Sequence, residues 1–207
     1  MTPPVPKGRL GGEMVAIVGG LARRFRLTSL IERHDSVAVM GGFAFVNGCI
    51  AIALMSLGAL ATGSPFVFPS LGPTAFLHFY TPMAPAACPR NTLCGHAVGV
   101  VAGVVSLQLF GLADAGPALA TGVDGARVAA TALSLGLTSG AMVWLRVPHP
   151  PAGATTMIIS LGILTEPAHL GVLMLAVGLL TVQAFAINRL ADVPYPRWAP
   201  RASPAVP

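Results

Sequence analysis

Two short stretches of the sequence combine prolines with small residues and hydroxyl side chains. Pro148–Ile158 reads PHPPAGATTMI, and Pro69–Leu77 reads PSLGPTAFL. Proline lacks a backbone N–H and is tolerated mainly in the first turn of a helix. We therefore expect each stretch to be extended chain that leads into a short helix, which begins near residues 71–73 in one case and near residues 151–153 in the other.

The N-terminal end of such a helix could bind an anion. Its first amides have no partner within the helix and carry the positive end of the helix dipole. Threonine hydroxyls would add donors, and Gly72 and Gly153 would allow close approach. Because a dipole end contributes only roughly 0.3–2 kcal/mol, the pattern predicts passage of a partly hydrated anion rather than tight binding. The alternative, in which proline and glycine merely kink packed helices, stays open.

The two stretches supply the expected substrate-binding residues. These are Ser70, Gly72, Pro73, Thr74, Ala75, His78, His149, Pro150, Pro151, Ala152, Gly153, Ala154, Thr155 and Thr156. His149 could donate to the anion or titrate as a gate near neutral pH, or it could bond to a backbone carbonyl. His78 lies four residues after Thr74, on the same helical face, which favours a role facing the pore.

The composition places these stretches in a lipid bilayer. The chain is 54% hydrophobic and only 9% charged, whereas a soluble domain would carry about 25% charged residues. The three cysteines show neither a metal-binding spacing nor a disulfide framework, so we expect no metal and no cofactor. The net charge of +5 lies mostly near the termini, which the positive-inside rule explains better than nucleic-acid binding does.

The spacing of the charged residues predicts the membrane segments. None occurs between Ser36 and Pro89, and the later gaps between charges approach the roughly 20 residues that a spanning helix needs. We therefore expect an all-α integral membrane protein with six membrane segments. These lie at about 36–61, 66–81, 93–113, 126–145, 150–165 and 168–189.

The same charges predict the orientation. Residues 1–35 would be a cytoplasmic segment that could form an interfacial helix, residues 36–190 the transmembrane domain, and residues 191–207 a disordered cytoplasmic tail. With both termini in the cytoplasm, every Lys and Arg except Arg127 falls on the inner side. The expected location is a bacterial inner membrane.

The six segments divide into two halves, residues 36–113 and residues 126–189. With an offset of 81 positions, the halves share the pattern P-x-x-G-x-T, formed by Pro69, Gly72 and Thr74 and by Pro150, Gly153 and Thr155. Three segments per half would insert the second half upside down, which is the inverted-repeat plan of many transporters. The second and fifth segments would then be broken half-helices whose N-termini face each other near the membrane centre.

Other polar residues could line the path. We expect Asn47, Arg90, Asn91 and His96 at a pore mouth or wall. The alternatives are that Arg90 anchors the topology, that His96 lies at the interface, and that Asn47 bonds a neighbour. The apolar segments contain no Asp or Glu, which argues against a cation pathway.

Glycines on the third predicted segment suggest a packing role. Gly99, Gly103 and Gly111 provide small-residue faces. Such faces serve close packing of helices within or between subunits more often than they serve chemistry.

The stretch PHPPAGATTMI resembles the signature of the HPP family of integral membrane proteins. PSLGPTAFL and PRNTLCGH (Pro89–His96) resemble two further stretches of that family in the same order, and the resemblance covers about residues 25–190. Family members are usually described with four spanning helices, and members from photosynthetic organisms are linked to nitrite transport. Gly72-Pro73-Thr74 stands where the family pattern has Gly-Ala-Ser, and Cys88 and Cys94 replace Gln and Gly.

The expected function is a membrane channel or facilitator for a small inorganic anion, with nitrite implied by the resemblance, and not an enzyme. Its expected partners are the anion, the lipid bilayer and further copies of the same chain. Two alternatives stay open. One is a structural or signalling subunit without flux, and the other is a membrane enzyme with a His/Cys centre.

Overall fold

The computed structural model describes residues 27–200, and over this range it contains helices and no strand. The elements are α2 (Leu27–Arg33), α3 (Ser36–Thr62), α4 (Leu71–Tyr80), η1 (Pro85–Ala87), α5 (Pro89–Leu109), α6 (Ala118–Thr121), α7 (Gly125–Trp144), α8 (Ala152–Ser160) and α9 (Pro167–Leu190). The all-helical class is confirmed. The interfacial helix expected within residues 1–35 lies largely outside the described residues.

Four helices in the described range, α3, α5, α7 and α9, are long and apolar enough to cross a membrane. They correspond to the first, third, fourth and sixth predicted segments. α5 begins at Pro89 rather than near residue 93, because proline is well suited to the first helical position. The described residues thus contain four candidate membrane spans rather than six helices of spanning length.

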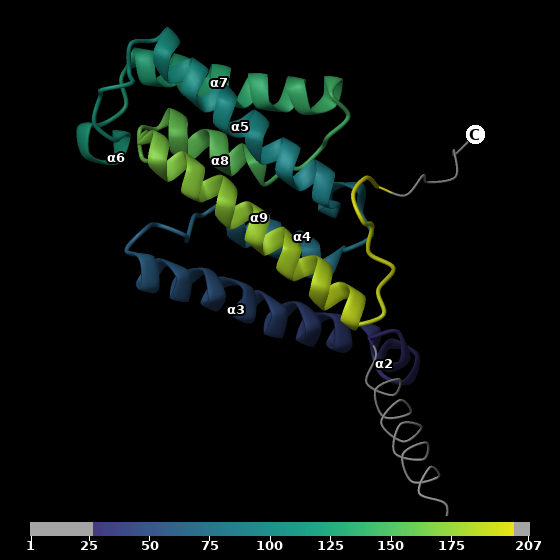
Figure 1. Ribbon diagram of the computed structural model, residues 1–207. Coiled ribbons are helices and arrows are strands. Elements are labelled where there is room, and N and C mark those ends of the chain that lie inside the picture. The colour runs from purple at the N-terminus through teal and green to yellow at the C-terminus, as the bar shows by residue number, and fades with distance from the viewer. Residues whose placement is uncertain (1–26, 201–207) are drawn as a thin grey trace, which may run out of the picture.

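The second and fifth predicted segments form short helices. α4 has 10 residues and α8 has 9, so at 1.5 Å per residue each is about 14–15 Å long, roughly half of the hydrocarbon thickness. Their starts at Leu71 and Ala152 confirm the boundaries that the prolines predict. In Figure 1 the link before α4 enters from the end where α3 finishes, and the link before α8 enters from the opposite end.

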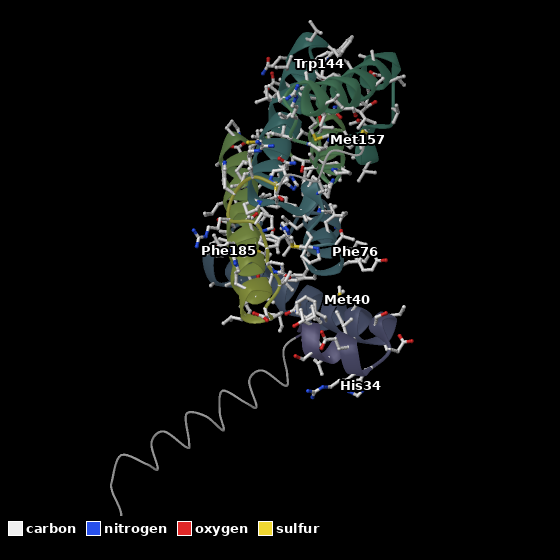
Figure 2. All side chains as sticks on the ribbon, turned by 90° about the vertical axis from the view of Figure 1, so that its right-hand side faces the viewer. His34, Met40, Phe76, Trp144, Met157 and Phe185 are labelled. Carbon is white, nitrogen blue, oxygen red and sulfur yellow. The ribbon has the colours of Figure 1, made fainter. Side chains whose placement is uncertain are left out.

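The short helices pack against long helices of both halves of the chain. α4 lies against α3 and α9, whereas α8 lies against α7 and α5, and α5 also contacts α9. Figure 1 shows α9 between α3 and the group of α5, α7 and α8. In Figure 2, Phe76 on α4 and Phe185 on α9 lie on opposite sides of the molecule.

Hydrogen bonds between loops show which segments share an end of the bundle. At one end Leu27 N–H donates to Ala191 O (3.3 Å), and the guanidinium of Arg90 donates to Arg146 O (3.0 Å). At the opposite end, Ala118 N–H at the start of α6 donates to Leu161 O, directly after α8, at 2.8 Å. The link before α4 and α4 itself therefore carry the chain from one end of the bundle to the other.

The segment after α9 packs back onto the bundle, although the sequence favoured disorder from residue 191. It is described as far as Pro200, and Tyr195 is fully buried. Arg90 N–H donates to Trp198 O at 3.0 Å. Composition alone missed this contact because the prolines around Tyr195 exclude a helix but not an ordered extended strap. We call residues 192–198 the C-terminal strap.

Candidate functional site

The inner face of α4, together with its N-cap, carries three polar side chains at helical spacing. Ser70, Thr74 and His78 follow one another at intervals of four residues, and all three are fully buried. Residues so spaced lie one above the other on a helix. The Thr74 hydroxyl lies 2.8 Å from the carbonyl oxygen of Ser70. This face points into the bundle and not toward lipid.

His96 of α5 connects the two short helices. Its Nε2 lies 3.0 Å from Thr74 Oγ1 on α4, and its Nδ1 lies 2.7 Å from Thr155 Oγ1 on α8. The imidazole is fully buried. His96 is therefore enclosed by the helices and not exposed on the surface of the bundle. Sequence spacing could not place it, because its partners are distant in the chain.

His149 completes the group. Its Nε2 lies 3.2 Å from His96 Nε2 and 3.3 Å from Thr74 Oγ1, while its Nδ1 lies 2.7 Å from Ala86 O. The ring is fully buried, and its centroid lies 4.9 Å from that of His96. We call Thr74, His96, His149 and Thr155 the His–Thr cluster. Its side chains touch directly, so the structure depicts a closed site.

One arrangement of protons satisfies the cluster with both histidines neutral. A carbonyl can only accept, so His149 Nδ1 donates to Ala86 O and its Nε2 is an acceptor. His96 Nε2–H then points to Thr74 and His149, and Thr155 donates to His96 Nδ1. The hydrogen bonds therefore run in one direction, from Thr155 through His96 to His149. A network satisfied in this way is stable in a low-dielectric interior.

Glycines on α5 bring α8 and His149 close enough for these contacts. A Cβ placed on Gly95 would lie 2.7 Å from His149 Cβ, and one on Gly99 would lie 2.7 Å from Ala152 O. A Cβ on Gly103 would lie 2.8 Å from Ile159. The packing role predicted for Gly99 and Gly103 is confirmed. Gly111 instead ends the helix with a φ of 65°.

The glycines expected to allow close approach at the helix starts do not serve it. A Cβ on Gly72 would meet nothing within 4 Å, and one on Gly153 would make only an ordinary contact with Leu135 at 3.5 Å. Pro73 is exposed, whereas Pro151 is buried. The glycines that allow the helices of the site to approach closely are instead those of α5.

The free amides predicted at the start of α8 are also absent. The N–H groups of Ala152, Gly153 and Ala154 donate to the carbonyls of residues 149–151 at 2.9–3.0 Å. The chain enters the helix through a tight turn that already satisfies these donors. The hydrogen-bonding groups at the centre of the site are therefore side chains, whereas the sequence predicted backbone N–H groups there.

His78 belongs to a neighbouring polar group. Its Nδ1 lies 2.9 Å from the hydroxyl oxygen of Tyr195, and that hydroxyl donates its proton to Ala87 O. Asn188 Nδ2 donates to His78 O at 2.9 Å. Burial raises the pKa of the Tyr195 phenol, which keeps the hydroxyl protonated as a donor. Tyr195 was missed because it lies in the segment for which the sequence favoured disorder.

The residues expected at a pore mouth have structural partners. Asn47 donates to Phe43 O of its own helix, and Asn91 Nδ2 donates to Pro85 O. Arg90 Nε donates to Asn91 Oδ1 at 3.1 Å. For Asn47 and Arg90 the structure therefore fits the alternatives, a bonded neighbour and an anchor for the chain at that end. None of the three contacts the His–Thr cluster through a side-chain bond within residues 27–200.

The remaining expected residues lie around the cluster. Thr156 is buried and lies 3.5 Å from Ser134 O on α7, Ala75 and Ala152 are buried, and Pro150 is exposed. Within residues 27–200, no group of three or more His, Cys, Asp or Glu side chains could hold a metal ion.

The fold and the cluster together define a class: an all-helical integral membrane protein with a polar centre between two short helices. Residues 33–196 match the family described as HPP, transmembrane region. The chain belongs to this family, and the resemblance drawn from its motifs is confirmed. No curated protein and no solved structure matches the chain significantly.

Proposed function

We propose that this HPP family protein is a channel or facilitator that moves a small inorganic anion, preferably nitrite, across a membrane. Membership of a transmembrane family is consistent with a transport-related role. The path runs through the His–Thr cluster, which opens by separating the side chains of Thr74, His96 and His149. We place both termini in the cytoplasm and the protein in a bacterial inner membrane, following the distribution of Lys and Arg.

The observation that carries this proposal is the meeting of both short helices at one imidazole. Thr74 and Thr155 contact opposite nitrogens of His96 at 3.0 and 2.7 Å. Interrupted helices that meet inside a membrane protein are typical of substrate sites in transporters. Ionisable residues in the interior of a membrane protein commonly mark a substrate or ion path.

The packing of the helices supports an inverted repeat. α4 packs on α3 and α9, and exchanging the two halves turns this pattern into α8 on α7 and α5, which is also found. The two short helices begin in matching sequence contexts. We infer that the halves, 36–113 and 126–189, descend from one unit and cross the membrane in opposite directions.

The chemistry of the cluster favours an anion over a cation. Hydroxyl and imidazole groups can present hydrogen-bond donors, and α4, α5 and α8 contain no carboxylate. Cation pathways commonly carry Asp or Glu at this depth. Nitrite, with two accepting oxygens and one negative charge, suits a pair of imidazole N–H donors.

The test is flux through proteoliposomes. Purified protein should release entrapped nitrite faster than empty vesicles, as measured by external nitrite with a colorimetric assay. Thr74→Val combined with Thr155→Val should slow this flux about 30-fold or more, since two bonds to buried partners are lost at about 1–3 kcal/mol each. Thr62→Val is the matched control, because Thr62 is exposed at the end of α3.

Two outcomes would overturn the proposal. Flux equal to that of empty vesicles would favour a subunit without transport. Full flux in the double variant, with wild-type elution on size exclusion, would move the path away from the cluster.

A further inference from the structure

The contact between His96 and His149 restricts the number of protons that the pair can hold. Their Nε2 atoms lie 3.2 Å apart, so one must donate and the other accept. If both carried a proton on Nε2, two N–H groups would point at each other. His149 Nδ1 is already committed as a donor to Ala86 O. In the closed site the pair therefore shares a single proton between its facing nitrogens.

A bound anion would change the number of protons that the pair must hold, because an anion can only accept hydrogen bonds. An anion that bridges the two imidazoles needs an N–H from each Nε2. His96 supplies one, but His149 Nε2 holds a lone pair in the closed site. Placing an anion against that lone pair would be repulsive. The second donor therefore requires one additional proton on the pair.

We propose that the His96–His149 pair binds its anion together with one proton, so that transport is electroneutral anion–proton symport. This inference rests on the proposed transport of an anion. On loading, the closed pair takes up one proton and one anion, and the two imidazole N–H groups bridge the anion. On release, at the other side of the membrane, the proton and the anion leave and the hydrogen bond between the imidazoles forms again.

The electrostatics of the membrane interior favour this pairing. A lone ion in a low-dielectric environment is strongly disfavoured, whereas a hydrogen-bonded pair of opposite charges is far less so. The cluster is fully buried and lacks a fixed positive charge of its own. A proton that binds together with the anion supplies a positive charge only while the anion is in the site.

A third buried histidine, His78, lies on the same helix as Thr74. His78 lies on α4, one helical turn beyond Thr74. Its Nε2 is buried without a hydrogen-bond partner, while its Nδ1 lies 2.9 Å from the Tyr195 hydroxyl. The His78 Nε2 lone pair is therefore free to accept a hydrogen bond.

No carboxylate competes for the proton on the helices that surround the pair. α3, α4, α5, α7 and α8 contain neither Asp nor Glu, and the end of α9 near His78 contains none either. The cationic side chains of these helices are Arg90, Arg127 and Arg189. Arg90 and Arg127 bond to groups near the loops, and Arg189 lies over the ring of Phe185. On the side of η1 and the strap, the other titratable groups are Cys88, Asp192, Tyr195 and Arg197.

The first experiment measures protons and nitrite in the same vesicles. Proteoliposomes contain a pH-sensitive dye, their membrane potential is clamped with potassium and valinomycin, and nitrite is added outside. We expect internal acidification matched to nitrite entry, about one proton per anion, and a rate that is insensitive to the clamped potential. Empty vesicles give the background of nitrous acid that crosses lipid unaided.

The outcomes separate this inference from the proposed function. No nitrite entry above the background would overturn the transport function itself. Nitrite entry that follows the membrane potential and leaves the internal pH unchanged would keep the function and overturn the symport.

The second experiment tests the pair directly. In His149→Gln the amide cannot take up a proton, so we expect the ratio of protons to nitrite to fall toward zero or nitrite entry to fall to background. His169→Gln is the matched control, because His169 lies at the start of α9, away from the cluster. An unchanged ratio of protons to nitrite in His149→Gln would overturn the assignment to this pair.

Nuclear magnetic resonance gives a readout that needs no flux. In wild-type protein labelled with ¹⁵N-histidine, we expect saturating nitrite to convert the His149 signal from neutral imidazole to imidazolium. Chloride at the same ionic strength serves as the reference for non-specific salt effects. A His149 that stays neutral when nitrite shifts the neighbouring signals would overturn the inference.

Discussion

Thr74 and Thr155 bind opposite ring nitrogens of one side chain, His96. Thr74 Oγ1 lies 3.0 Å from Nε2, and Thr155 Oγ1 lies 2.7 Å from Nδ1. The two threonines occupy equivalent positions of the repeated P-x-x-G-x-T pattern. The His96 imidazole thereby joins the two halves of the chain. A substitution of His96 should therefore affect the packing of both short helices.

Gly95 sets the position of His149, and enlarging it should disturb the cluster. In Gly95→Ala the new methyl would lie 2.7 Å from His149 Cβ, so one of the two must move. Overpacking of this kind costs typically about 1–3 kcal/mol. We expect a lower melting temperature in detergent and slower nitrite flux.

Gly136→Ala on α7 is the control, because a Cβ there meets nothing within 4 Å. It should be neutral or slightly stabilising, since alanine restricts the unfolded chain. Equal stability of the two variants would mean that His149 moves aside without cost.

Tyr195 fastens the C-terminal strap to the bundle. Tyr195→Phe removes the hydroxyl that bonds to His78 Nδ1 and to Ala87 O. Buried partners left unsatisfied cost about 1–3 kcal/mol. We expect faster amide hydrogen exchange in residues 192–198, measured by mass spectrometry. Tyr80→Phe should leave that exchange unchanged, because the Tyr80 ring is exposed.

Arg127 closes the opposite end of the bundle. Its guanidinium is almost fully buried and donates to Ser160 O at 3.1 Å and to Gly116 O at 2.8 Å. A lysine ammonium lacks the planar fork that spans two acceptors. We expect Arg127→Lys to lose about 1.5–3 kcal/mol of stability, the range for a hydrogen bond to a charged group.

The measurement is thermal unfolding in detergent, with Arg197→Lys on the exposed part of the strap as the reference. Indistinguishable melting temperatures would show that the two carbonyls do not depend on the guanidinium.

Cys88 reports on the environment at the start of α5. Burial raises the pKa of its thiol, so less of the reactive thiolate is present at a given pH. In a background of Cys49→Ala and Cys94→Ala, we expect the alkylation rate by iodoacetamide to reach its half-maximum at a higher pH than for an exposed thiol. Thr121→Cys, made together with Cys88→Ala in that background, provides the exposed thiol. Coinciding pH profiles would contradict the burial of Cys88.

Several features of the fold could be predicted from the sequence because they depend on local chemistry. The long apolar segments follow from the absence of charge over stretches of spanning length. The starts of α4 and α8 follow from proline, which excludes the preceding residues from a helix. The equivalence of Thr74 and Thr155 follows from the repeated pattern. Each of these features can be read from short local patterns of residues.

The partners within the site depended on the tertiary structure. His96 lies 22 residues from Thr74 and 53 from His149, and no helical or strand period relates such positions. The sequence assigned anion binding to free amides at the helix starts, but a tight turn already satisfies those of α8. Gly95 and Gly99 then let α8 approach α5 until side chains meet.

Local patterns therefore determined where helices begin and which segments are apolar, since backbone geometry and transfer from water act residue by residue. Only packing decided which polar groups share a site, because a buried hydrogen bond needs two groups from distant parts of the chain within about 3 Å of each other.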